Sequence, residues 1–269
     1  MKKHAPIVLL LFLGLPWAAA RAQQAPLPPF RTGPLRLEKV SFSKTKGNCN
    51  DGPCVTASID YLKVVSAENA QAGARLTAAI ANWVLRLPGG RVAKNPQEVI
   101  DEFVDSTWET RQGEAKPGPS FSRPLIETIT LEVEYQSPRA LSLSLFVGSY
   151  TGGAHPNEWL TYANFRPATG ERIHLTDIFK QGFTVPLNAV GERRFRELKG
   201  LGPQESLKNT RFRFPNDQFQ LNDNFAINTY GLVFYFQDYE IGPHAEGPTK
   251  LFLPYKDIRD LLRPDADIP

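Results

Sequence analysis

Two stretches near the start of the chain alternate apolar and polar residues, a pattern typical of β-strands with one buried face. The first covers residues 35–44 and the second covers residues 55–61. The turn between them reads Asn50-Asp51-Gly52-Pro53, which predicts a hairpin. Cys49 and Cys54 bracket this turn, and in an oxidising compartment such a pair is expected to form a disulfide that pins the hairpin. Metal binding by the pair is the weaker interpretation, because no second Cys or His pair has ligand spacing.

The period of the pattern then lengthens to that of a helix. Between residues 67 and 87 apolar side chains recur at helical spacing, and Pro88-Gly89-Gly90 ends the run. A second helix is predicted to begin at Asn95-Pro96, an N-cap residue followed by proline at the first helical position. Trp83 and Trp108 lie on the apolar stripes of these two helices, so each is expected to anchor its helix on a sheet.

The second half of the chain reads as strands joined by short turns, which favours an antiparallel meander over alternating crossovers. The predicted strands cover residues 126–135, 141–147, 159–165, 172–175, 212–225, 232–236 and 250–253. The predicted helices cover residues 176–179, 186–199 and 255–262. A polar segment rich in Gly and Pro, residues 112–119, is the expected domain boundary. The sequence therefore predicts an α+β fold of antiparallel sheets with helices packed on them, in an N-terminal module (35–116) and a C-terminal module (120–269).

The start of the chain has the pattern of an export signal followed by a linker. Residues 1–22 read as a secretory signal peptide, because Lys2 and Lys3 precede an apolar run and Ala20-Arg21-Ala22 forms a cleavage site. That run is shorter than the roughly 20 residues that span a bilayer, and no later stretch has the length and apolarity of a membrane helix. Residues 23–34 form a Pro-rich linker. We expect a secreted or periplasmic protein, cleaved near Ala22 and without a transmembrane anchor thereafter.

The charge balance argues against one broad class of partner. The whole chain has 31 Lys and Arg residues against 28 Asp and Glu residues. Loss of Lys2, Lys3 and Arg21 with the signal peptide leaves 28 of each, a formal net charge of zero. A nucleic acid or an anionic membrane bound through bulk charge is therefore not expected.

The segment Ser149 to Asn157, SYTGGAHPN, is the strongest candidate for a functional element. It joins two predicted strands, and its glycines suit a tight or left-handed backbone. It also holds His155, a side chain that can donate, accept, ligate a metal or titrate near neutrality, although a turn needs no histidine. Only His174 and His244 accompany it after the predicted signal peptide.

Two separated stretches resemble one family pattern. The first runs from YTGGAHPN to NFRPATGERIHLTDIF, and the second is LVFYFQDYEIGPHAEGPTKLFLPYKDI. Together, across residues 125–262, they resemble a bacterial envelope domain, the extracytoplasmic module of lysozyme-sensing anti-sigma factors (RsiV-like) and the accessory domain of PdaC-like peptidoglycan deacetylases. The N-terminal half looks like the smaller module that usually precedes it. The resemblance implies an α+β fold outside the cytoplasm and, in the best-understood members, binding to lysozyme.

Two departures limit what this resemblance implies. The chain lacks the transmembrane helix and cytoplasmic sigma-binding segment of an anti-sigma factor. It also lacks the metal-binding aspartate and histidine motifs of a deacetylase catalytic domain. The resemblance therefore implies an envelope binding module rather than either named activity.

The leading hypothesis is a non-catalytic protein without a cofactor that binds a lysozyme-like protein or a peptidoglycan fragment. Aromatic side chains such as Tyr150, Trp159 and Tyr239 would supply contact area, as anchors do in recognition surfaces. The expected binding residues are Tyr150, Gly152, Gly153, His155, Asn157, Tyr239 and His244.

Other interpretations stay open. In one, the chain is a purely structural envelope protein: His155 bonds backbone groups and only stabilises the glycine turn, with Tyr239 and Ile241 packed beneath it. In another, Asp238 and Glu240 share one face of a strand and hydrolyse wall glycans as a carboxylate pair. A metal site is disfavoured, because the sequence has no HExxH or HxxxH spacing and His174 is expected within a strand. A serine hydrolase is disfavoured too, since no G-x-S-x-G is present.

Overall fold

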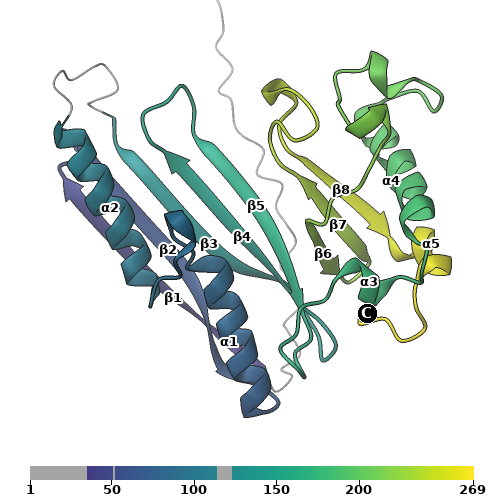
Figure 1. Cartoon of the computed structure of the whole chain (residues 1–269), viewed down its shortest axis with the longest axis horizontal. Helices are drawn as coiled ribbons and strands as arrows, with labels where there is room; N and C mark the ends of the chain where they lie inside the picture. The colour runs from purple at the N-terminus through teal and green to yellow at the C-terminus, as the bar shows by residue number, and fades with distance from the viewer. Residues whose placement is uncertain (1–34, 51, 114–122) are drawn as a thin grey trace, which may run out of the picture. The chain divides into compact units, whose positions relative to one another are not determined.

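A computed structural model describes residues 35–50, 52–113 and 123–269, and the predicted signal peptide and linker lie outside these ranges. The described residues belong to one compact unit. It contains a five-stranded sheet in the order β1-β2-β3-β4-β5 and a three-stranded sheet in the order β6-β7-β8 (Figure 1). The predicted α+β class is confirmed.

The elements follow the sequence patterns closely in the first half of the chain and loosely in the second. The strands are β1 (Arg36–Gly47), β2 (Cys54–Ser66), β3 (Leu125–Gln136), β4 (Leu141–Tyr150), β5 (Asn157–Phe165), β6 (Phe225–Asn228), β7 (Gly231–Phe236) and β8 (Thr249–Pro254). The helices are α1 (Ala70–Val84), α2 (Pro96–Gly113), α3 (Leu175–Ile178), α4 (Thr184–Lys199) and α5 (Tyr255–Ile258). In the part of the chain that the structure describes, no helix has the length and hydrophobicity of a membrane span.

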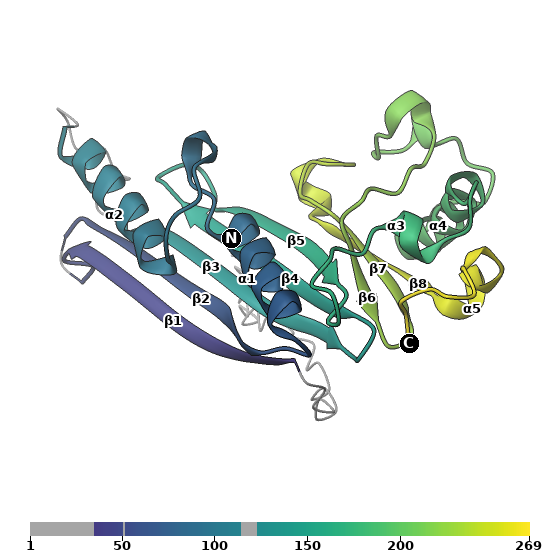
Figure 2. The same cartoon turned by 60° about the horizontal axis from the view of Figure 1, so that its bottom comes forward.

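The predicted hairpin with its disulfide is confirmed. Strands β1 and β2 pair antiparallel, and Cys49 and Cys54 are disulfide-bonded. The predicted start of the second helix is confirmed as well, since the Asn95 side chain accepts a hydrogen bond from the backbone N–H of Glu98 at 3.0 Å. Helices α1 and α2 both cover the same face of the five-stranded sheet (Figure 2).

The prediction of a purely antiparallel arrangement is wrong at one position. Strands β2 and β3 pair in parallel, with Ala57 opposite Glu127. The reason is the connection between them: α1 and α2 form a crossover over one face of the sheet, and a crossover returns the chain in the same direction. The expected boundary at residues 112–119 therefore does not separate two sheets, because strands from both sides of it share one sheet.

Two predicted strands are absent from the described structure. Residues 172–175 contribute only an isolated bridge between Phe165 and Arg172. Residues 212–224 form loops with one short 3₁₀ turn, Pro215–Asp217, although Phe212, Phe214 and Phe219 are buried. Their rings pack around Phe195 of α4 with centroid distances of 4.9–5.4 Å. Apolar spacing there reflects packing on a helix rather than pairing in a sheet.

The two sheets meet through a buried polar junction. The side chain of Asn164 on β5 donates to the carbonyl of Phe225 at 2.8 Å and accepts from the backbone N–H of Ile227 at 3.0 Å. The Ser142 hydroxyl also accepts from that N–H at 3.0 Å and donates to Asn164 at 2.5 Å. All of these groups are buried, so the junction fixes the start of β6 against β4 and β5.

The free edge of β5 is covered by side chains instead of another strand. Asn224 accepts from the backbone N–H of Tyr162 at 2.7 Å and donates to the carbonyl of Leu160 at 2.8 Å. Arg172 donates to the carbonyl of Tyr162 at 3.1 Å. These contacts satisfy an edge that would otherwise be open to pairing with another chain.

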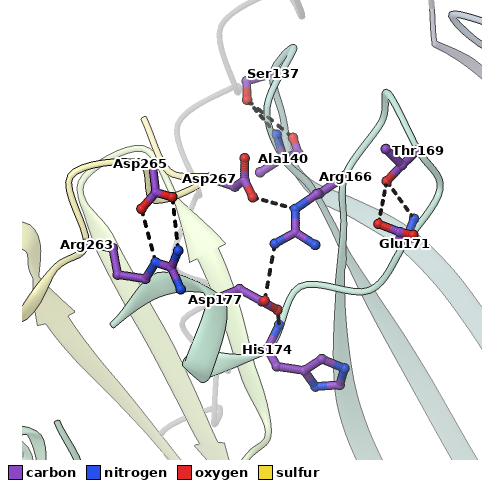
Figure 3. Close-up of polar contacts among 10 residues, drawn as sticks. All are labelled: Ser137, Ala140, Arg166, Thr169, Glu171, His174, Asp177, Arg263, Asp265 and Asp267. Carbon is purple, nitrogen blue, oxygen red and sulfur yellow. Dashed lines mark hydrogen bonds and ion pairs between the residues drawn. The ribbon is translucent and has the colours of Figure 1, made fainter. Parts of the chain in front are cut away.

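A second polar anchor follows β5 (Figure 3). Arg166 contacts Asp177 of α3 at 3.3 Å and Asp267 near the C-terminus at 2.5 Å. His174 lies at the start of α3, where its backbone N–H donates to Asp177 at 2.8 Å. The expectation that His174 lies in a strand is therefore wrong, and its ring points away from the Arg166–Asp177 pair (Figure 3).

Candidate functional site

Three rings from two distant segments stack on one another at the surface. The imidazole centroids of His155 and His244 lie 4.5 Å apart with an interplanar angle of 15°. The Tyr239 ring lies 5.3 Å from His244 and 6.5 Å from His155, also stacked. We refer to His155, Tyr239 and His244 as the ring cluster. The β4–β5 and β7–β8 connections that carry them lie at the same end of their sheets, at the top of Figure 1.

The glycine turn between β4 and β5 places His155. Gly152 has a φ of 95°, which a residue with a side chain rarely adopts, so glycine is required there. Gly153 shows no such requirement, because its φ is not in that range and an added Cβ would meet only the carbonyl of His155 at 3.9 Å. The ring nitrogen Nδ1 of His155 lies 2.8 Å from the carbonyl oxygen of Pro156.

A tight turn after β7 places the other two rings. Tyr239 adopts a φ of 64° and is 60% exposed, so its ring is held out on the surface. Glu240 accepts from the backbone N–H of Gln237 at 2.6 Å and from the side chain of Asn222 at 2.8 Å. Ile241, which follows, is buried in the C-terminal core. The backbone strain at Tyr239 is therefore held in place by contacts on both sides.

Gln237 ties this turn to the sheet that carries His155. Its side-chain oxygen accepts from the backbone N–H of Leu160 at 3.1 Å, and its amide nitrogen donates to the Leu160 carbonyl at 2.7 Å. Because Leu160 lies on β5 just after the glycine turn, this pair of bonds holds the two histidine-bearing segments beside each other.

Asp238 gives the ring cluster its charge. Its carboxylate contacts Nδ1 of His244, and its other oxygen accepts from the backbone N–H of Tyr239 at 3.1 Å. The His244 side chain is half exposed, whereas that of Asp238 is mostly covered. The carboxylate therefore orients the imidazole and leaves Nε2 as the ring nitrogen available to a ligand.

The structure brings only part of the predicted site together. His155, Tyr239 and His244 form the cluster, whereas Tyr150 packs against the N-terminal core. Asn157 is exposed at the first position of β5, opposite Ser149. Trp159, half exposed on the same strand, remains a candidate aromatic contact.

Several expectations about the site require correction. Asp238 and Glu240 do not share a strand face, because β7 ends at Phe236 and both lie in the turn that follows. Tyr239 does not pack beneath His155, since it is largely exposed.

Within the described ranges, no group of three His, Cys, Asp or Glu side chains is arranged to hold a metal ion.

Sequence reasoning missed Gln237, which links the two halves of the site. The polar side chain of Gln237 at a strand end did not by itself indicate this role, because its partner is the backbone of Leu160, far along the chain. The strict alternation Leu232, Phe234, Phe236 stops just before it, and that break is the only local hint.

Comparison with family models divides the chain into two segments. Residues 49–158 match the model described as deacetylase PdaC, and residues 176–256 match the model described as protein of unknown function DUF3298. The expected likeness to PdaC and to a domain of unknown function is confirmed, whereas the RsiV-like, lysozyme-sensing part of the resemblance stays a prediction. Residues 159–175 separate the two matched segments, so the border between them lies within β5 and the connection to α3, not near residue 116. A PdaC-type segment and a disulfide are compatible with a secreted or periplasmic protein.

The relatives place the fold and the family. Esterase Rv3036c of Mycobacterium tuberculosis (strain ATCC 25618 / H37Rv) is 30% identical over 177 residues, which cover 61% of this chain and 72% of the relative. The chain belongs to the same protein family as this mycobacterial relative.

Two solved structures share the fold. A DUF3298 family member from Bacteroides fragilis NCTC 9343 has a TM-score of 0.70 at 20% identity, covering 86% of this chain and 95% of its own. A DUF3298 family protein from Pseudomonas aeruginosa PAO1 has a TM-score of 0.66 at 19% identity, covering 88% of this chain and 98% of its own.

Proposed function

We propose that the chain is an exported protein of the bacterial cell envelope that recognises a lysozyme-like protein or a peptidoglycan fragment through the ring cluster. The observation that carries this proposal is the surface stack in which the exposed rings of Tyr239 and His244 lie beside the half-buried ring of His155. Stacked rings offer a rigid apolar face, and recognition surfaces use such rings as anchors because they lose little conformational entropy on binding.

The polar groups around the stack would supply direction. Nε2 of His244 is a donor or an acceptor depending on the tautomer, and the Tyr239 hydroxyl can do both. Asp238 adds a negative charge that is already oriented. A sugar ring or a protein loop would thus find an apolar platform with hydrogen-bonding groups at its rim.

Calorimetric titration of residues 23–269 with hen-type lysozyme and with muropeptides tests the proposal. Saturable binding to either ligand is expected, with loss of affinity by tenfold or more in His155→Ala, a loss that corresponds to about 1.4 kcal/mol. His174→Ala is the matched control, because His174 is also exposed and lies outside the ring cluster. Equal affinity of the His155→Ala variant, or no heat with either ligand, would refute the proposal.

A second candidate function is ester hydrolysis, which the printed name of the mycobacterial relative suggests. The Asp238–His244 contact is the arrangement of a general base oriented by a carboxylate. His244 Nε2 would take a proton from a water molecule that attacks the ester carbonyl, and would return it to the departing alcohol. No serine hydroxyl among the described residues bonds to His155 or His244, so water is the nucleophile in this version.

Hydrolysis of p-nitrophenyl butyrate distinguishes the candidates. An esterase should lose at least a hundredfold in kcat when His244 is replaced by Gln, because a general base contributes roughly 10²–10⁴-fold. A binding protein should show no turnover above that of the His244→Gln variant. The glycan hydrolase with Asp238 and Glu240 stays a proposal with less support, because Glu240 is engaged by Gln237 and Asn222.

A further inference from the structure

A cavity of about 220 Å³ opens between the two N-terminal helices and the sheet beneath them. Its walls come from the end of α1, the α1–α2 connection, α2, β3 and β4, and they are mainly apolar. They include the aromatic rings of Trp83 and Phe103. The carboxyl group of Glu127 also lines this cavity, on the helix-covered face of β3.

Glu127 has no protein partner at this position. It forms no hydrogen bond or ion pair with any other residue of the described ranges, and its neighbours across the sheet are Ala57 and Ser149. Burial among apolar groups raises the pKa of Glu127 to about 7. A half-buried carboxyl on the wall of a cavity, without a hydrogen-bonding or charged partner, destabilises the fold when it is ionised, which makes it a candidate for a ligand contact.

The other charged groups on the cavity wall are Arg86 and Glu102. Arg86 is exposed and makes no ion pair with Glu127, while Glu102 is engaged by Arg91 at 3.5 Å. The β4 residues on the wall, Leu145 and Val147, are apolar. Because Glu102 is already engaged by Arg91 and Arg86 is exposed to solvent, Glu127 is the carboxyl group on this wall without a protein partner, and it favours a cation over an anion.

We propose that this cavity binds a primary ammonium group carried on a short hydrocarbon chain, with Glu127 as the counter-ion and Trp83 and Phe103 as aromatic walls. Aromatic faces attract cations, and the apolar lining suits the hydrocarbon. The volume is below the range of roughly 300–1,000 Å³ typical of drug-sized ligands, so it fits an amine-bearing side chain or tail rather than a whole ligand. This site lies in the PdaC-type segment and is independent of the ring cluster.

Titration of residues 23–269 with n-butylammonium chloride at pH 8.5, followed by the indole N–H resonances, tests the site. The Trp83 signal should shift saturably while that of half-exposed Trp159 stays in place. Glu127→Gln should weaken binding at least tenfold because it removes the charge and keeps the shape. Glu132→Gln, on the same strand with an exposed side chain, is the matched control and should bind as the unmodified chain does.

Two further arms examine the role of charge. n-Butanol, which has the same hydrocarbon and no charge, should bind at least tenfold more weakly than the amine. Lowering the pH to 6 should weaken amine binding about tenfold, because most Glu127 side chains are then protonated. Unchanged affinity in Glu127→Gln, equal binding of n-butanol, or the absence of a saturable Trp83 shift would overturn the proposal.

Discussion

The imidazole of His155 lies face to face with that of His244, with their centroids 4.5 Å apart. The two residues come from connections that belong to different sheets, and each sheet has its own hydrophobic core. The contact therefore depends on how the three-stranded sheet is attached to β5. Gln237, which bonds both backbone groups of Leu160, is the attachment nearest to the rings.

Replacement of Gln237 by Ala tests that attachment. It leaves the N–H of Leu160 without its partner and the carbonyl with Asn224 as its remaining donor, which should lower the free energy of unfolding by about 1–3 kcal/mol. The His155 and His244 ring resonances should also change, because the turn is released from β5. Exposed Gln218 is the matched control, and urea denaturation of Gln218→Ala should give an unfolding free energy within about 0.5 kcal/mol of the unmodified chain. Equal stability of both variants would contradict the assigned role.

The buried junction between the sheets should be more sensitive. Asn164→Ala removes the donor to Phe225 and one of two acceptors for Ile227, so we expect a loss of about 3 kcal/mol in unfolding free energy. Chemical denaturation measures this directly. Asn82→Ala, at an exposed helical position, controls for the change in composition and should cost little. A loss below about 1 kcal/mol at Asn164 would mean that the junction is not a principal link.

Glu127 should make stability fall as the pH rises. Its folded-state pKa of about 7 lies above the ordinary value of 4.5, so the folded protein holds this proton more tightly than the unfolded chain does. The penalty is absent below about pH 4.5, grows as the pH rises towards 7, and is constant above it. Glu127→Gln should therefore match the unmodified chain near pH 4.5 and exceed its unfolding free energy by about 2–3 kcal/mol at pH 8. Denaturation curves at both pH values measure the difference, and a pH-independent effect would contradict the assigned environment.

The disulfide should contribute modestly. Cys49 and Cys54 are only five positions apart, and in the chain-entropy model so short a loop gives about 2 kcal/mol. We expect the Cys49→Ser, Cys54→Ser double variant to remain folded, with a small decrease in denaturation midpoint and the same fold by circular dichroism. Unfolding of the variant would show that the hairpin needs the bond to form.

Local patterns identified most elements, because each depends on neighbours in the sequence. The alternation around Ile59, the helical stripe of Leu76 and the N-cap at Asn95 are examples. The parallel pairing of β2 with β3 depends on where two helices cross the sheet, and no local spacing encodes it. Burial of Phe212 and Phe214 on α4 gave the spacing of a strand without a strand partner.

The candidate site was predictable only in part for the same reason. The unusual composition of the turn, a histidine beside Gly and Pro, indicated His155. A second histidine beside Gly and Pro indicated His244. Their stacking rests on Gln237 and Asn224, polar side chains that satisfy the edge of β5. The sequence did point to Glu127, because this carboxylate stands on the same face of the strand pattern as the apolar residues Ile129 and Leu131. That signal has meaning only once the cavity beside it is known.

The central claim is that the ring cluster binds an envelope ligand, and nuclear magnetic resonance of the histidine side chains tests it most directly. After the predicted signal peptide is removed the chain has three histidines, so their ring signals can be assigned individually. On titration with a muropeptide or with lysozyme, the signals of His155 and His244 should shift together and saturate, while that of His174 stays unchanged. Shifts at His174 alone, or at none of the three with either ligand, would contradict it.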